Sequence, residues 1–263
     1  MIHISLNLSP SVTQIMSPAL NRTGQRQTGS AGFTLLELMV VIAIASVLMA
    51  LLLPALSSAK EKSRRCVCKE TQHQFLSAFV MYVDDHDNDY LPSAADNAGA
   101  YHSIRLSDNT FTNLAVYLSG ETNSFYCPNL VFATGQMGGH DAKGYIIGYS
   151  YLAIMHSSFS QKGPDVYVGL QKASETTGPL LADANYWSMD PGATLSMAPH
   201  SPHGSVVANA AVGMNTTLAG TNSAALGAAG GNIGFLDTSV FWRSIRSMSS
   251  YPAASDLSAL ANY

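Results

Sequence analysis

Charged side chains are scarce in this chain, because Asp, Glu, Lys and Arg together make up only 11% of its 263 residues. Acidic residues outnumber basic ones, 17 to 13, which gives a formal net charge of −4 at pH 7. A protein that binds nucleic acid needs clustered basic side chains to meet the phosphates. The composition therefore argues against nucleic acid as a partner.

The common catalytic motifs are also absent from the sequence. It contains no G-x-S-x-G nucleophile elbow, no H-E-x-x-H zinc motif, no P-loop and no G-x-G-x-x-G fingerprint. Two histidines and two aspartates could in principle converge on a metal or proton-transfer site: His200, His203, Asp183 and Asp237. Residues of these types also line ordinary loops, so we predict that the chain is not an enzyme and needs no cofactor or metal.

The longest apolar run covers residues 38–53 and is interrupted only by Ser46. Counted over residues 33–56, it gives a helix of about 24 residues and roughly 36 Å, enough to cross a bilayer core of about 30 Å. One acid, Glu37, lies at the leading edge of the run. Because a carboxylate in hydrocarbon costs on the order of a few kcal/mol, Glu37 needs a partner, and an amine is the natural candidate.

The residues at the start of this run are Gly32-Phe33-Thr34-Leu35-Leu36-Glu37-Leu38. This segment resembles the processing site of the type IV prepilins and of the pseudopilins of type II secretion systems. The resemblance implies that a prepilin peptidase cleaves after Gly32 and methylates the new terminus, Phe33. It also implies that Glu37 registers each subunit against its neighbour, where it would neutralise the amine at a helix N-terminus. The alternative is a plain signal anchor with an incidental acid.

Residues 1–32 have the character of a leader peptide, with two arginines, Arg22 and Arg26, and no acid. Arginines ahead of an apolar run keep that side in the cytoplasm and direct the C-terminus outward. We therefore predict a single-pass inner-membrane protein whose C-terminal domain lies outside the cytoplasm. Removal of the leader would leave 11 bases and 17 acids, a net charge of −6. Met16 is an alternative start of translation.

Helical spacing continues beyond the apolar run, because residues 55–83 contain neither Gly nor Pro. We predict one helix from residue 34 to 83, with a membrane half at 33–54 and an exposed half at 55–83. Pro54 is expected to kink it or to weaken one hydrogen bond. The first exposed turns carry side chains that suit the lipid headgroup region: Lys60, Glu61, Lys62, Arg64 and Arg65.

Four residues of the exposed half share a helical face that should pack on a globular domain: Cys68, Phe75, Phe79 and Tyr82. Cys127 belongs to that domain, and an outward-facing protein occupies a compartment that permits disulfides. We therefore predict a bridge between Cys68 and Cys127, with Cys66 pointing to the opposite side of the helix. Three buried thiols are the alternative. A metal site built on the C-x-C pair would lack a second pair of ligands.

Residues 84–263 are predicted to form a globular α+β domain in which an antiparallel sheet packs on the long helix. Aromatic and β-branched residues predict strands at 145–152, 166–168, 233–236 and 240–242, and a short helix is expected at 111–118. The segment at about 205–231 is uncharged and rich in Ala, Gly, Asn and Thr, which predicts a flexible loop.

An acidic segment at the end of the long helix imitates a calcium-binding loop through Asp85, Asp87, Asp89 and Asp96. Tyr90 replaces the glycine that makes the sharp turn of such a loop, and its last ligand is Asp instead of Glu. We therefore expect a solvated loop that ends the helix, with calcium binding as the alternative.

The order of short motifs after residue 83 is similar to that of bacterial prepilin-type proteins whose C-terminal domain ends in His-x9-Asp-Gly. These motifs are Leu91-Pro92, Cys127-Pro128, Gly148-Tyr149-Ser150-Tyr151, Leu181-Ala182-Asp183, His203-Gly204 and residues 231–237. The sequence departs from the pattern twice, because 33 residues separate His203 from Asp237 and Thr238 replaces the final glycine.

Two functions are compatible with these patterns. In the first, the chain is a structural subunit of a pilus-like filament, most similar to a type II secretion pseudopilin. Its partners would be further copies of itself, prepilin peptidase, a secretion or pilus assembly platform and the inner membrane. In the second, the helix tethers an outward-facing module for glycans or cell wall, with four aromatic stacking candidates: Tyr101, Tyr186, Trp187 and Trp242. For Trp242 we predict core packing instead.

Overall fold

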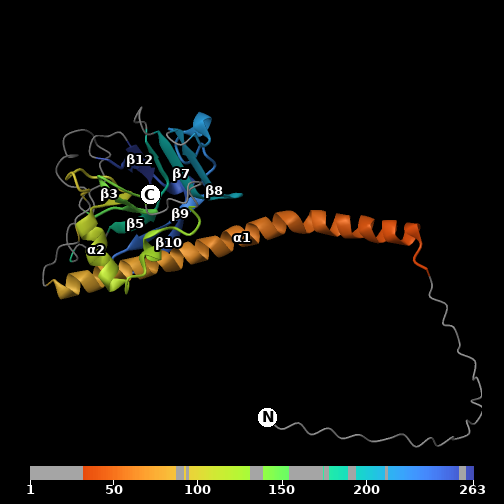
Figure 1. The fold of residues 1–263 in the computed structure, drawn as a ribbon, viewed down its shortest axis with the longest axis horizontal. Coiled ribbons are helices and arrows are strands. Elements are labelled where there is room, and N and C mark those ends of the chain that lie inside the picture. The colour runs from red at the N-terminus through yellow and green to blue at the C-terminus, as the bar shows by residue number, and fades with distance from the viewer. Residues whose placement is uncertain are drawn as a thin grey trace, which may run out of the picture. The chain divides into compact units, whose positions relative to one another are not determined.

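The computed structural model describes residues 32–86, 92, 95–130, 139–153, 174, 178–188, 194–210, 213–254 and 259–263. The chain divides into two units, residues 1–47 and 48–263. Helix α1, Leu35–Asp85, contributes to both (Figure 1). The predicted long N-terminal helix is confirmed, and together with the antiparallel sheets described below it gives an α+β, pilin-like layout.

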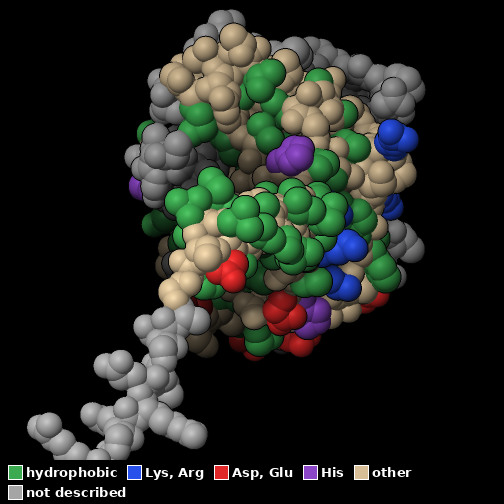
Figure 2. Space-filling view, turned by 90° about the vertical axis from the view of Figure 1, so that its right-hand side faces the viewer, with side chains coloured by type: hydrophobic (Ala, Val, Ile, Leu, Met, Phe, Trp, Pro, Cys, Tyr) green, Lys and Arg blue, Asp and Glu red, His purple; other side chains and the backbone are tan. Residues whose placement is uncertain are grey.

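Helix α1 is the one helix among the described residues that is long and apolar enough to cross a bilayer, and its most apolar stretch is fully exposed. Figure 2 looks toward the N-terminal end of α1 and shows its hydrophobic side chains gathered on the surface. The helix continues through Pro54. The hydroxyl of Ser57 donates to the Pro54 carbonyl at 2.9 Å.

The second half of α1 buries one face against the domain, as its aromatic spacing predicts. Cys68, Phe75 and Phe79 are fully buried there. The ring of Phe75 stacks on Phe79 at 4.9 Å between centroids and meets Phe125 edge-on at 4.7 Å. Such aromatic pairs contribute roughly 0.5–1.5 kcal/mol each beyond the area they bury, so this cluster fixes the helix on the domain.

A four-stranded antiparallel sheet lies against α1 (Figure 1). Its strands, in the order β10-β9-β5-β4, are Val240–Ser244, Gly230–Phe235, Pro179–Asp183 and Tyr149–Tyr151. Gly234 allows β9 to approach the helix, because a Cβ atom at this position would lie 2.5 Å from Leu76 Cδ1. The strands predicted at 233–236 and 240–242 correspond to β9 and β10.

A five-stranded antiparallel sheet supplies the other large layer. In the order β11-β12-β6-β7-β8, its strands are Ser250–Pro252, Ala259–Asn262, Tyr186–Ser188, Leu195–Ser201 and Gly204–Asn209. The segment predicted as a loop at 205–231 therefore differs from expectation at its start, where β8 pairs with β7. Ser205-Val206-Val207-Ala208 has the β-branched content that a strand favours.

A three-stranded sheet, β1-β3-β2, consists of Arg105–Leu106, Gly144–Ile146 and His140–Asp141. The strand predicted at 145–152 is divided into β3 and β4 at Gly148. The Cβ atom of any larger residue at position 148 would lie 2.3 Å from the backbone nitrogen of Cys127, so a glycine is needed where the two segments cross.

The remaining elements are short. Helix α2, Asp108–Tyr117, confirms the predicted helix but starts three residues earlier, because the hydroxyl of Ser107 caps it by accepting from the Thr110 N–H. Among the described residues, the 3-10 turns are η1 (Thr122–Phe125), η3 (Thr216–Leu218) and η4 (Ile245–Ser247). The strand predicted at 166–168 lies outside the described residues.

Candidate functional site

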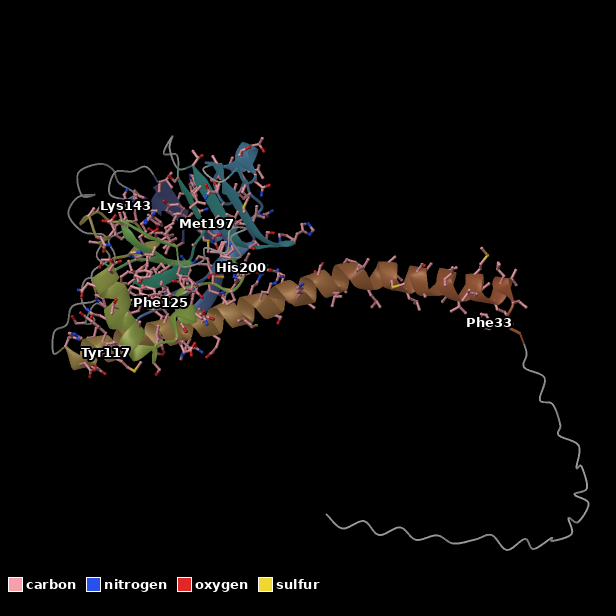
Figure 3. The ribbon with its side chains drawn as sticks, in the orientation of Figure 1. Phe33, Tyr117, Phe125, Lys143, Met197 and His200 are labelled. Atoms are coloured by element: carbon pink, nitrogen blue, oxygen red, sulfur yellow. The ribbon has the colours of Figure 1, made fainter. Side chains whose placement is uncertain are left out.

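The processing segment begins just outside α1. Gly32, Phe33 and Thr34 are exposed and precede the first helical residue, and the side chain of Phe33 is 69% exposed (Figure 3). The peptide bond after Gly32 therefore lies in non-helical, accessible backbone. This is the geometry that a peptidase requires.

Glu37 closes a capping box at the start of α1. Its Oε2 atom accepts from the Thr34 backbone N–H at 2.9 Å and from the Thr34 hydroxyl at 2.8 Å, while the Glu37 N–H donates to Thr34 Oγ1 at 3.2 Å. In the single chain the carboxylate thus turns back on its own helix end. It lies within one turn of Phe33, whose nitrogen would become a free amine on cleavage.

A second constellation lies buried beneath α1. Cys68 lies on α1 and Cys127 lies just after η1, and their sulfur atoms are 2.6 Å apart. Both residues are fully buried, and both are free thiols. Cys66 is exposed, as predicted from the helical spacing. The bridge between Cys68 and Cys127 stays a prediction.

The two thiols differ in acidity. The hydrogen bond with Cys127 lowers the pKa of Cys68 to about 7 in spite of its burial, whereas burial raises the pKa of Cys127 well above its ordinary value. In the reduced protein Cys68 is therefore the thiol that loses its proton more readily.

Asp183, on β5, and His200, on β7, complete this buried group. Together with Cys68 and Cys127 they place one ligand atom each within 4.8 Å of one another. His200 is labelled in Figure 3, where it lies between the strands and α1. Asp183 and His200 belong to the set of possible metal or proton-transfer residues that also includes His203 and Asp237, and the structure brings together only the first two. His203 and Asp237 are exposed in turns.

Charged side chains surround His200. Its Nδ1 atom lies 2.9 Å from Glu61 Oε1, and its Nε2 atom lies 3.3 Å from Asp183 Oδ2. Burial alone would lower the pKa of His200, but the carboxylate of Asp183 and the sulfur of Cys68 outweigh it and raise the pKa to about 10. Arg65 donates to Glu61 Oε1 at 3.1 Å. Glu61, predicted for the headgroup region, is therefore buried instead, because it pairs with His200 and Arg65.

Asp183 is held by neutral donors. Gln72 Nε2 donates to its Oδ1 at 2.7 Å, and the Asn232 backbone N–H and side-chain amide donate to its Oδ2 at 2.6 and 3.1 Å. Such hydrogen bonds compensate a buried carboxylate for lost water. The sequence does not predict that the two cysteines lie beside Asp183 and His200, because these side chains come from distant segments with no common spacing.

The calcium alternative gains no support from the described residues. Asp96 uses Oδ1 to accept from the N–H groups of Ala98 and Ala100, as a turn residue does. Asp85 is exposed, and Asp87 and Asp89 lie outside the described residues.

The aromatic stacking candidates are mostly buried. Tyr101, Tyr186 and Trp187 are 4–8% exposed and belong to the packed interior. The prediction of core packing for Trp242 is wrong, because it lies on edge strand β10 and is 37% exposed, with the Arg65 guanidinium 3.9 Å from its ring centroid. The described surface therefore offers one of the four candidate platforms.

Thr238, which replaces the final glycine of the His-x9-Asp-Gly pattern, has an unfavourable backbone conformation. Thr238, in the turn between β9 and β10, has a φ of +65°, a left-handed conformation that glycine adopts more readily. Asp237 accepts from the N–H and hydroxyl of Ser239 in the same turn. Asp237 thus shapes a hairpin and makes no contact with the buried group described above.

Comparison with known proteins bears on the N-terminal segment. A family model for the prokaryotic N-terminal methylation motif matches residues 28–53. Searches of curated proteins and of solved structures find no match to the chain. The matched segment includes the exposed peptide bond after Gly32, the capping box of Glu37 and the apolar part of α1 before Pro54. The chain therefore carries the N-terminal methylation motif of the prepilin-type proteins and fits the precursor of a type IV pilin or pseudopilin.

Proposed function

We propose that this chain is the precursor of a pseudopilin, a structural subunit that polymerises into a short pilus-like filament of a type II secretion-like system. The observation that carries the proposal is the methylation motif running directly into an apolar helix whose most apolar stretch is not buried among the described residues. In the membrane, lipid covers this surface. In a filament, the same surface of neighbouring subunits would replace lipid.

Each segment of the chain has its own role in this proposal. Residues 1–32 are a leader that prepilin peptidase removes, residues 33–54 anchor the mature subunit in the inner membrane, and residues 55–83 carry the domain of residues 84–263 outside the cytoplasm. Cleavage turns the Phe33 nitrogen into an amine, and methylation follows there. The carboxylate of a neighbouring subunit's Glu37 then pairs with this amine, because an ion pair in hydrocarbon is far less costly than two separate charges.

The processing step has a direct test. Expression with a prepilin peptidase should yield a chain whose intact mass equals residues 33–263 plus one methyl group, whereas expression without the peptidase should yield the uncut precursor. A chain whose mass stays that of the precursor in both cultures would favour a plain signal anchor.

The system type has a separate test. Deletion of the gene from its host should abolish release of secreted enzymes while leaving surface pili unchanged. Loss of surface pili with normal secretion would assign the subunit to a type IV pilus instead.

The predicted bridge between Cys68 and Cys127 would tie α1 to the domain. Two thiols would lose two protons, and a thiol–disulfide oxidant of the outer compartment would accept the two electrons. The bridge spans 59 positions, so reduction or Cys127→Ser should lower the free energy of unfolding by about 4 kcal/mol. Cys66→Ser, two residues away and exposed, should leave it unchanged. The measurement is urea unfolding combined with alkylation of the denatured, unreduced protein, where only Cys66 should react; alkylation of all three cysteines would contradict the bridge.

A further inference from the structure

The proposed disulfide involves only the two cysteines of the buried group beneath α1 and leaves Asp183 and His200 without a role. Among the described residues, His200 Nε2 is a fully buried nitrogen without a hydrogen-bond partner, although it lies 3.3 Å from Asp183 Oδ2. The contact has an ion-pair distance but not the alignment of a hydrogen bond. A buried polar atom without a partner calls for a reason.

We propose that Cys68, Cys127, Asp183 and His200 form a binding site for one zinc ion when the two cysteines are reduced. Four ligand atoms within 4.8 Å of one another match the size of a tetrahedral zinc site, whose bonds are about 2.0–2.3 Å long. Two thiolates, one imidazole and one carboxylate also match the preference of zinc for sulfur and nitrogen ligands over the all-oxygen sets of calcium or magnesium. All four residues are buried, as in a structural site.

The groups behind these ligands orient them as outer-shell partners do. Glu61 Oε1 lies 2.9 Å from His200 Nδ1, and because a carboxylate only accepts, it holds a proton on Nδ1, so Nε2 is the nitrogen that can bind a metal once its own proton is lost. Gln72 and Asn232 hold the carboxylate of Asp183. The ligands stand on α1, β5 and β7 and directly after η1, so packed elements fix three of the four.

Zinc and the disulfide would be alternative states of the same sulfurs. Two thiolates on one tetrahedral zinc are about 3.8 Å apart, given Zn–S bonds of about 2.3 Å, and a disulfide holds them at about 2.0 Å. Binding of zinc therefore requires the sulfurs to lie farther apart than they do in the disulfide. Zinc would displace the two thiol protons and any proton on Nε2, and solvent would accept them.

The test uses the full mature chain in detergent, kept reduced with a phosphine and freed of metal. Zinc titration should give one ion per chain by elemental analysis. Cobalt(II), used as a spectroscopic substitute, should give the intense visible bands of a tetrahedral site together with near-ultraviolet bands of thiolate ligation. These spectra report the ligands without any variant, so they decide the proposal even where a substituted chain fails to fold.

Matched variants locate the ion. Cys127→Ser and His200→Asn should weaken zinc binding more than tenfold, whereas Cys66→Ser and His203→Asn, which alter an exposed cysteine and an exposed histidine outside the site, should leave it unchanged. The proposal is overturned by a reduced chain that binds no zinc, by cobalt spectra without thiolate bands, or by zinc that is lost with Cys66→Ser. It is equally overturned if the two cysteines can be reduced only by unfolding the protein.

Discussion

Replacing Glu37 by glutamine should abolish filament assembly while leaving cleavage after Gly32 intact. The structure makes glutamine the informative choice, because its side-chain oxygen can still accept from Thr34 and so preserve the capping box that Glu37 forms. Only the charge is removed. If the carboxylate pairs with the Phe33 amine of a neighbouring subunit, that amine would be left unpaired in hydrocarbon at a cost on the order of a few kcal/mol per subunit.

The expected readout is at least a tenfold loss of sheared filament at unchanged amounts of mature subunit. Glu37→Ala removes both charge and cap and should assemble no better. As a control, Glu121→Gln removes an exposed acid of the domain and should assemble normally. Normal filaments from Glu37→Gln would show that capping its own helix is the whole role of Glu37.

Replacing His200 by leucine should lower the free energy of unfolding by about 3–5 kcal/mol, measured in chelator with free thiols. The change removes the cation between two buried carboxylates, Glu61 and Asp183, and removal of one member of a buried charged group typically costs this much. Arg65 still pairs with Glu61, so Asp183 bears most of the loss. His203→Leu changes an exposed histidine three positions away and should alter the stability by less than about 0.5 kcal/mol.

The same histidine predicts a dependence on pH with a definite sign. The pKa of His200 is about 10 in the folded protein and near 6.5 when unfolded. Because the folded state holds the proton more tightly, the stabilisation is fully present below pH 6.5 and is lost as pH rises toward 10, by at most about 1.4 kcal/mol per pH unit. The stability difference between wild type and His200→Leu should therefore shrink over this window, and a constant difference would contradict a protonated His200.

The sequence predicts the parts of this molecule that depend on local periodicity. The apolar run, the aromatic face of α1 and the strands at β9 and β10 follow from spacings of one helix turn or one strand alternation. The sequence also predicts the contact between Cys68 and Cys127, because helical geometry selects Cys68 over Cys66 as the cysteine that faces the domain.

The buried charges could not be predicted in the same way. Glu61 stands in a run of charged residues that is typical of a solvated helix surface, and its burial depends on His200, 139 positions later. The break between β3 and β4 likewise depends on the Cys127 backbone, which crosses at Gly148. Local patterns carry no information about such distant partners.

The proposed function requires most of all that the apolar helix of the mature subunit forms the core of a polymer. The measurement that tests it most directly is N-terminal sequencing of filaments sheared from cells that contain the peptidase and the assembly platform. The account predicts that polymerised chains begin with methylated Phe33. Chains that stay monomeric in the membrane with residues 1–32 still attached would contradict it.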